Sequence, residues 1–175
     1  MAEYRTQEQV EEYLARIFNP DRRYRLYPFE IGWLVQSVLS QEEIDSGMGL
    51  GMTNLVIDAE NGTVYQYPSW SGPMIADDFR EAKQAGRQPT AYQVYPPQWR
   101  LSIQRVHEDP QTIRYSVQIM SLTSPPQENA DYELTIDKTT YAYQPPAPMA
   151  SNVIAWTEIR SSQDGAWPSQ GTWEI

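Results

Sequence analysis

The chain of 175 residues contains no cysteine. Disulfide bonds, thiolate nucleophiles and cysteine-ligated metals are therefore excluded, and the composition is compatible with a reducing compartment. The sequence also has a single histidine and lacks the G-x-S-x-G, H-E-x-x-H and Walker motifs. We therefore expect a protein that is not an enzyme, with no catalytic residues, no cofactor and no metal.

No run of apolar residues reaches the length of about 18 that a membrane span needs. The first 18 residues carry charge throughout and lack the apolar core of a signal peptide. Basic residues are few: 13 Lys and Arg oppose 23 Asp and Glu, giving a net charge of −10. Such a surface repels nucleic-acid phosphates and anionic membranes, and it speeds encounter with a basic partner. We expect a cytoplasmic protein that binds neither nucleic acid nor membrane, although many soluble proteins are acidic for solubility alone.

The first half of the chain predicts two helices around a set of strands. Thr6 and Gln9 have the spacing of a capping box, and apolar residues at helical spacing follow over residues 10–18. Strands are expected at residues 23–30 and 32–39. A hairpin is expected at residues 54–67, with Asn61 and Gly62 in a type I′ turn or a bulged three-residue loop. A second helix is expected over residues 75–85, with Asp77 and Asp78 in its first turn.

From residue 91 onward the sequence alternates between apolar and polar residues in short segments, which Pro- and Gly-containing loops separate. Strands are expected at residues 92–95, 99–106, 112–120, 132–136 and 153–159, and no helix. The C-terminal segment, residues 161–175, has the composition to fold back as an edge strand. The fold class is therefore α+β, with residues 1–90 as a helix-plus-sheet domain. Residues 91–175 form an antiparallel, strand-rich half, which extends the first domain or makes a second one.

Two kinds of side chain are candidates for binding a partner. Carboxylates gather in the polar loop after the second strand and at the start of the second helix, and Trp70 lies in a Ser-Trp-Ser-Gly loop that is hard to bury. Exposed aromatic residues beside acidic ones are typical anchors of protein-binding surfaces. The candidate contact residues are Glu42, Glu43, Asp45, Trp70, Asp77 and Asp78. Trp167 and Trp173 in the polar C-terminal segment are further aromatic candidates. His107 lies in a predicted turn, where a solvated role is the simplest interpretation.

Residues 5–88 resemble the bacterial immunity protein 35 (YrhB-like) family. The resemblance rests on the N-terminal helix, the Gly32-Trp33 strand, the glycine-containing loop at residues 47–51 and the Val56-Ile57-Asp58 hairpin with Gly62. It covers about half of the chain, and the strand-rich second half has no counterpart in the short family members. The resemblance implies a cytoplasmic protein that binds and neutralises a toxin domain, and it supplies no catalytic residues.

The expected function is therefore inhibition of a cognate bacterial toxin, expected to be a basic domain, by direct contact with an acidic surface. One alternative is a chaperone or secretion-accessory module for an effector protein. Another is a small-molecule-binding protein or enzyme with an aromatic pocket between helix and sheet.

Overall fold

The computed structural model describes residues 4–47 and 53–175 and divides the chain into two compact units, Met1–Pro96 and Pro97–Ile175 (unit 1 and unit 2). Each unit has one five-stranded antiparallel sheet, so the α+β class is confirmed. In the described part of the chain, no helix is long and apolar enough to cross a membrane. Two glycines of the expected 47–51 loop, Gly49 and Gly51, lie outside the described residues.

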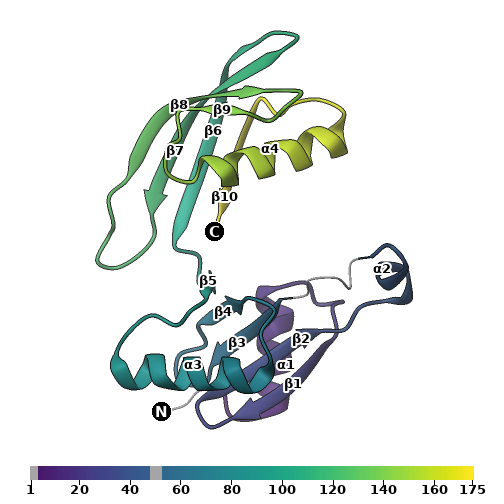
Figure 1. Ribbon diagram of the computed structural model, residues 1–175, viewed down its shortest axis with the longest axis vertical. Coiled ribbons are helices and arrows are strands. Elements are labelled where there is room, and N and C mark those ends of the chain that lie inside the picture. Colours follow the sequence, from purple (N-terminus) through teal and green to yellow (C-terminus); the bar gives the residue numbers. More distant parts are fainter. Residues whose placement is uncertain (1–3, 48–52) are drawn as a thin grey trace. The chain divides into compact units, whose positions relative to one another are not determined.

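Unit 1 contains a sheet with the strand order β1-β2-β3-β4-β5 (Figure 1). Its elements are α1 (Gln7–Ile17), β1 (Tyr24–Phe29), β2 (Gly32–Ser37), α2 (Gln41–Asp45), β3 (Asn54–Asp58), β4 (Val64–Tyr67), α3 (Gly72–Ala85) and β5 (Tyr92–Tyr95). The strand at residues 92–95 was predicted correctly, but it pairs with β4 and so belongs to unit 1 and not to the second half.

The sheet of unit 1 is covered on both faces. Val10, Tyr13 and Leu14 of α1 pack on one face together with Trp33 and Val35. On the opposite face, α3 contributes Ile75 and Phe79, which pack against Leu34, Val56 and Tyr67. Because neighbouring residues of a strand point to opposite faces, Trp33 and Leu34 belong to different cores, as the alternation in the sequence predicts.

Local signals set the ends of the unit 1 elements. The capping box at Thr6 and Gln9 is confirmed: the Thr6 hydroxyl accepts from the Gln9 N–H, and the Gln9 side chain accepts from the Thr6 N–H. The hairpin is also confirmed, but its loop has four residues, 59–62, and only Gly62 adopts left-handed backbone (φ 75°). Both expected turns are wrong: a type I′ turn needs two such residues in succession, and the bulged alternative has three loop residues, not four.

Two expectations for the helices of unit 1 are wrong. Residues 41–45 are not loop but the short helix α2, which Ser40 and Glu43 start with a second capping box. Helix α3 begins at Gly72, with Pro73 in its first turn, so Asp77 and Asp78 lie beyond that turn.

Unit 2 contains a sheet with the strand order β10-β6-β7-β8-β9 and one helix (Figure 1). Its elements are β6 (Trp99–Glu108), β7 (Thr112–Ser121), β8 (Ala130–Asp137), β9 (Tyr143–Gln144), α4 (Ala150–Asp164) and β10 (Gln170–Glu174). The C-terminal edge strand is confirmed, since β10 pairs with β6 along its whole length.

The strand expected at residues 153–159 is wrong, because this segment lies inside α4. Ala150, Val153, Ile154 and Thr157 are its buried residues, and their spacing is that of one helix face. These side chains cover the apolar face of the sheet, which Leu101, Tyr115, Val117 and Leu134 help to form. The opposite face of the sheet carries polar residues.

Candidate functional site

The six predicted contact residues all lie in unit 1, and two of them serve its internal structure. Glu43 accepts a hydrogen bond from the Ser40 N–H (2.8 Å) and pairs with Arg22 (2.5 Å). The Ser40 N–H and the Arg22 guanidinium hold the pKa of Glu43 below its usual value. The carboxylate therefore fixes the start of α2 and joins that helix to the segment before β1, which leaves it a poor contact residue.

Asp78 is the second of these structural carboxylates. Its oxygens accept hydrogen bonds from the Tyr67 hydroxyl (2.9 Å), the Thr90 N–H (2.8 Å) and the Arg87 guanidinium (3.1 Å). Partial burial would raise the pKa of Asp78, but these hydrogen bonds outweigh it and lower the pKa below its usual value. Its side chain is 13% exposed, so Asp78 connects α3, β4 and the segment before β5 and does not face a partner.

The other three carboxylates are available to solvent. Glu42 and Asp45 lie on α2 and are exposed, and Asp45 accepts a hydrogen bond from Gln41 (2.8 Å). Asp77 on α3 pairs with Arg80 (2.8 Å), although 65% of its side chain remains exposed. Trp70 is half-buried, and its ring packs beside that of Tyr67, with centroids 6.0 Å apart.

Trp70 and α2 line one hollow of about 480 Å³, which places two of the predicted segments around a common surface. Ile44 of α2 lines the same hollow and is 51% exposed. Asn54 fixes the position of the Trp70 loop, because its amide donates to the Trp70 carbonyl (3.1 Å) and accepts from Gln36 (2.9 Å). The wall of this hollow is therefore held rigidly by the sheet.

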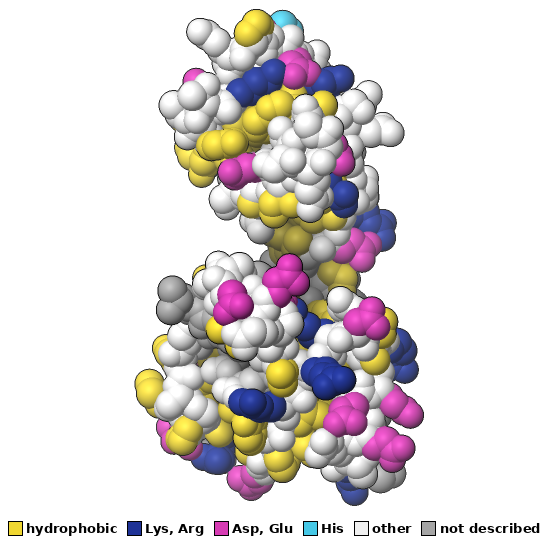
Figure 2. All heavy atoms as spheres, turned by 90° about the vertical axis from the view of Figure 1, so that its right-hand side faces the viewer, with side chains coloured by type: hydrophobic (Ala, Val, Ile, Leu, Met, Phe, Trp, Pro, Cys, Tyr) yellow, Lys and Arg dark blue, Asp and Glu magenta, His cyan; other side chains and the backbone are white. Residues whose placement is uncertain are grey.

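A second hollow of about 470 Å³ lies beside the N-terminal end of α3 and shares Gln36 with the first. It is lined by Tyr27, Phe29, Leu34 and Ala76 among others, and Tyr27 is 46% exposed. We call the two hollows together the β1–β2 groove, because β1 and β2 contribute residues to both. Figure 2 shows hydrophobic side chains at the surface of the molecule, interspersed with acidic and basic ones.

The groove combines an apolar lining with charges at its border. Glu42 and Asp45 flank Ile44 in the sequence of α2, and Asp77 follows Ala76 in α3. Arg25 is the one cation among the described residues that line the first hollow. Such a surface can hold another macromolecule by apolar contact and by attraction between opposite charges.

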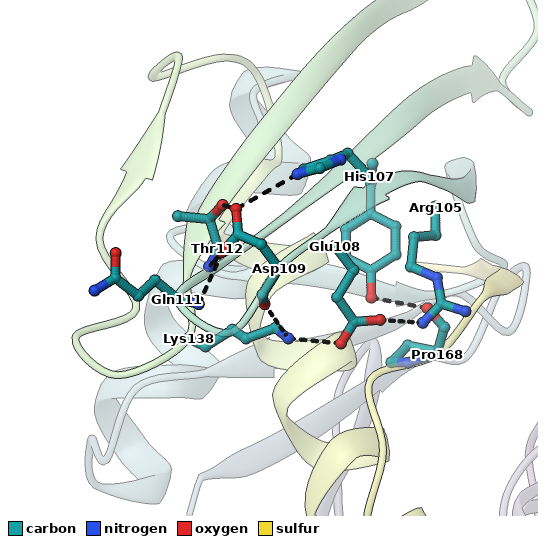
Figure 3. Close-up of polar contacts among 9 residues, drawn as sticks. Arg105, His107, Glu108, Asp109, Gln111, Thr112, Lys138 and Pro168 are labelled. Atoms are coloured by element: carbon teal, nitrogen blue, oxygen red, sulfur yellow. Dashed lines mark hydrogen bonds and ion pairs between the residues drawn. The ribbon is translucent and has the colours of Figure 1, made fainter.

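The single histidine belongs to a network of charged residues in unit 2 (Figure 3). His107 lies in β6 and not in a turn, and its side chain is 54% exposed. Its Nε2 is 3.4 Å from the Asp109 carboxylate. Hydrogen bonds to Asp109 from the Thr112 N–H (2.7 Å) and hydroxyl (2.8 Å), and from the Gln111 N–H (2.8 Å), lower the pKa of Asp109 to about 2. A carboxyl group with so low a pKa is ionised near neutral pH and has no proton to give, so it cannot act as a general acid there.

The remaining members of the network hold two turns of unit 2 together. Lys138 donates to the Glu108 carboxylate (2.6 Å) and to the Asp109 carbonyl (2.8 Å), and Arg105 also pairs with Glu108. These contacts join the end of β6 to the segment after β8. The network therefore has a structural explanation, and no nucleophile is hydrogen-bonded to His107 among the residues described. In that part of the chain, no group of three or more His, Asp and Glu side chains could hold a metal ion.

Sequence reasoning missed several residues of unit 1. Asp58, which carries part of the family resemblance, is 2% exposed and pairs with Lys83 of α3 (2.7 Å). Burial would lower the pKa of Lys83, but hydrogen bonds to Asp58 and Glu60 outweigh it and raise the pKa. The hydrophobic side chains of Ile44 and Tyr27 were also missed, because only the fold places them beside Trp70 and α3.

The predicted aromatic contacts are less exposed than expected. Trp70 packs against the core under α3, and Trp167 and Trp173 pack against the core of unit 2. Trp173 stacks on Trp156, with ring centroids 4.4 Å apart and planes 3° from parallel. Comparisons of the chain with models of protein families, with curated proteins and with solved structures found no match.

Proposed function

We propose that this protein acts in the cytoplasm as an immunity-type inhibitor, which binds a basic toxin domain through the β1–β2 groove and α2. The observation that carries the proposal is the coincidence of an exposed apolar lining, at Ile44 and Tyr27, with exposed carboxylates at Glu42 and Asp45. A binding surface of this kind needs no catalytic group, because inhibition requires only that the partner's active site or substrate path be blocked.

The two parts of the surface contribute differently to binding. Unit 1 carries 8 basic and 14 acidic residues, so its net charge is −6, which attracts a basic domain from a distance and speeds association. The apolar lining supplies affinity once the two proteins touch, since buried aromatic and aliphatic anchors dominate interface energies. Trp70 is already held by Asn54 and Tyr67, so little conformational entropy is lost when a partner covers it.

Binding assays with two matched double variants test the proposal. Glu42→Lys with Asp45→Lys reverses the charge beside the groove, whereas Glu11→Lys with Glu12→Lys makes the same change on the exposed side of α1. The partner for calorimetry is the toxin domain encoded beside the gene for this chain. We expect the first variant to weaken binding about tenfold or more, and the second by less than about threefold. Thermal melts establish that both variants remain folded.

The effect of salt and of partner activity completes the test. The association rate should fall as ionic strength rises, because salt screens exposed charges over about 8–10 Å. Equal weakening by both variants would contradict a role for the groove, and no binding at low salt would contradict the proposed function. If the domain is bound but remains active, and is stable only with this chain present, the protein is a chaperone and not an inhibitor.

A further inference from the structure

Each sheet has two edge strands, and three of the four carry features that hinder pairing with another chain. β1 contains Pro28, which has no N–H to donate, β5 has four residues and an irregular register, and β9 has only two residues. Proline, short length and irregular pairing are common protections of sheet edges. β10 has none of them, because its five residues pair with β6 in unbroken register.

The hydrogen bonds of β10 define which backbone groups face its free edge. Ile175 and Trp99 exchange N–H···O=C bonds of 2.9 Å, and the Arg105 N–H donates to the Ser169 carbonyl (2.8 Å). In an antiparallel pair, residues that bond to one neighbour alternate with residues that point away from it. The backbone groups of Gln170, Thr172 and Glu174 are therefore directed away from β6, toward the free edge.

We propose that β10 pairs with β10 of a second copy of this chain, antiparallel about a two-fold axis at Thr172. In this register all five residues of each strand find a partner, with Thr172 opposite Thr172 and Gln170 opposite Glu174. The residues whose backbone groups face outward are the ones that bond across the axis. The inference concerns unit 2 alone and does not rest on the proposed inhibitor function.

The side chains of the polar sheet face are self-complementary in this register. Glu174 is held by Arg100, whose Nε and Nη2 lie 3.0 and 2.7 Å from Oε1. The axis at Thr172 sets this carboxylate opposite a neutral amide, Gln170 of the second copy, which can donate to it. Like charges directly opposite one another destabilise a strand pair, so the symmetric register avoids that cost.

The opposite face of the sheet supplies apolar contact. The register places Trp173 of each copy opposite Gly171 of the other, over which the Trp156 ring of that copy lies. A Cβ atom at Gly171 would lie 2.2 Å from the Trp156 ring, so a larger residue there would displace that ring. Trp156 and Trp173 are both partly exposed, and a second copy would cover these indoles at the edge. Aromatic residues opposite glycine are a recognised way to stabilise edge pairing.

Charge variants at the symmetry axis give a test that depends on the two-fold register. Thr172→Lys and Thr172→Glu each place like charges opposite one another in a homodimer, whereas a mixture of the two variants places opposite charges there. Sedimentation velocity of the full chain at about 100 µM should show a dimer of the 20.2 kDa protein. We expect each variant alone to sediment as a monomer and the mixture to recover the dimer.

A single cysteine provides an independent readout, since the chain has no cysteine of its own. Opposed residues of a hydrogen-bonded antiparallel pair have Cα atoms about 5.5 Å apart, within the range that a disulfide can bridge. Thr172→Cys should therefore give a covalent dimer on mild oxidation. Gln118→Cys is the matched control, because Gln118 is exposed on the same sheet face but lies in the interior strand β7. Circular dichroism establishes that the variants are folded.

Three results would overturn the proposal: a monomeric wild-type chain, a dimer that Thr172→Lys leaves intact, or equal cross-linking of Thr172→Cys and Gln118→Cys. Failure of toxin binding has no bearing on these results, because the variants that test it lie in unit 1.

Discussion

The two units each contain a five-stranded antiparallel sheet, but helices cover the two sheets differently. In unit 1, α1 and α3 cover opposite faces, so the strands lie inside three layers. In unit 2, α4 covers one face and the other stays polar. The strand sequences reflect this difference: Leu55, Val56 and Ile57 are consecutive apolar residues in β3, whereas β7 alternates from Ile113 to Ile119. A sheet with two covered faces needs apolar residues at successive positions, and one with a single covered face needs them at every second position.

The number of covered faces also determines whether a charged side chain at the sheet is buried. Asp58 of unit 1 lies at the end of β3, under α3, where a carboxylate must find a partner, and Lys83 provides it. In unit 2, Asp131, Glu133 and Glu174 are exposed carboxylates on the open face of the sheet. Covering both faces of a sheet therefore increases the cost of any charged side chain at its border.

The largest expected effect is the loss of this buried pair. Asp58→Ala removes a carboxylate that binds Lys83 and the Glu60 N–H, and we expect unit 1 to lose about 3 kcal/mol of unfolding free energy. Asp131→Ala, an exposed carboxylate on the open face of unit 2, should change stability by less than about 0.5 kcal/mol. Urea unfolding followed by hydrogen exchange of each unit measures both values. Equal effects of the two substitutions would contradict a structural role for Asp58.

Alanine substitutions on the two faces of each sheet test the comparison directly. Leu34→Ala and Ile57→Ala lie on opposite faces in unit 1, and each should cost about 3 kcal/mol. In unit 2, Ile119→Ala should cost about as much, while Gln118→Ala, on the open face, should change stability by less than about 0.5 kcal/mol. Calorimetry of the four variants is the measurement. A large loss in Gln118→Ala would mean that the open face is covered in solution.

A smaller effect is expected from acid at the β6–β7 turn. Because the folded pKa of Asp109 is about 2, below its ordinary value of 3.8, its ionised form stabilises the turn above about pH 4. That contribution is lost as the pH falls from about 4 to 2. The difference in melting temperature between the wild type and Asp109→Asn should therefore be positive at pH 7 and shrink over this interval. If the difference in melting temperature did not change with pH, the effect would come from the hydrogen-bond geometry of the substituted amide and not from the charge of Asp109.

Local sequence signals predicted much of unit 1. The capping box at Thr6, the turn at Gly62 and the alternation around Trp33 depend on neighbours in the chain, and each was placed correctly. The alternating strands β6, β7 and β8 were also predicted, because one open face produces a clear period of two.

Helix α4 shows where propensity misleads. Val153, Ile154, Trp156, Thr157 and Ile159 are β-branched or aromatic, so the segment indicates a strand by composition. The spacing of Ala150, Val153, Ile154 and Thr157 matches a helix, and the apolar face of the sheet selects that conformation because it buries all four. Gly165 then ends the helix in left-handed backbone.

The candidate site was only partly predictable. Glu42, Asp45 and Trp70 were identified by their chemistry, but the groove that Trp70 and Ile44 line is assembled from β1, β2, α2 and α3, which are distant in sequence. The structural roles of Glu43 and Asp78 were hidden for the same reason, since Arg22 and Tyr67 come from other elements.

The stacked indoles of Trp156 and Trp173 also provide a spectroscopic signal. They are separated in the chain by the end of α4 and the following turn, so they meet only while β10 is docked on β6. Immobilised aromatic rings give near-ultraviolet circular dichroism, which disappears when fixed packing is lost. The C-terminal strand thus carries its own label-free optical reporter, with which closure of unit 2 can be followed.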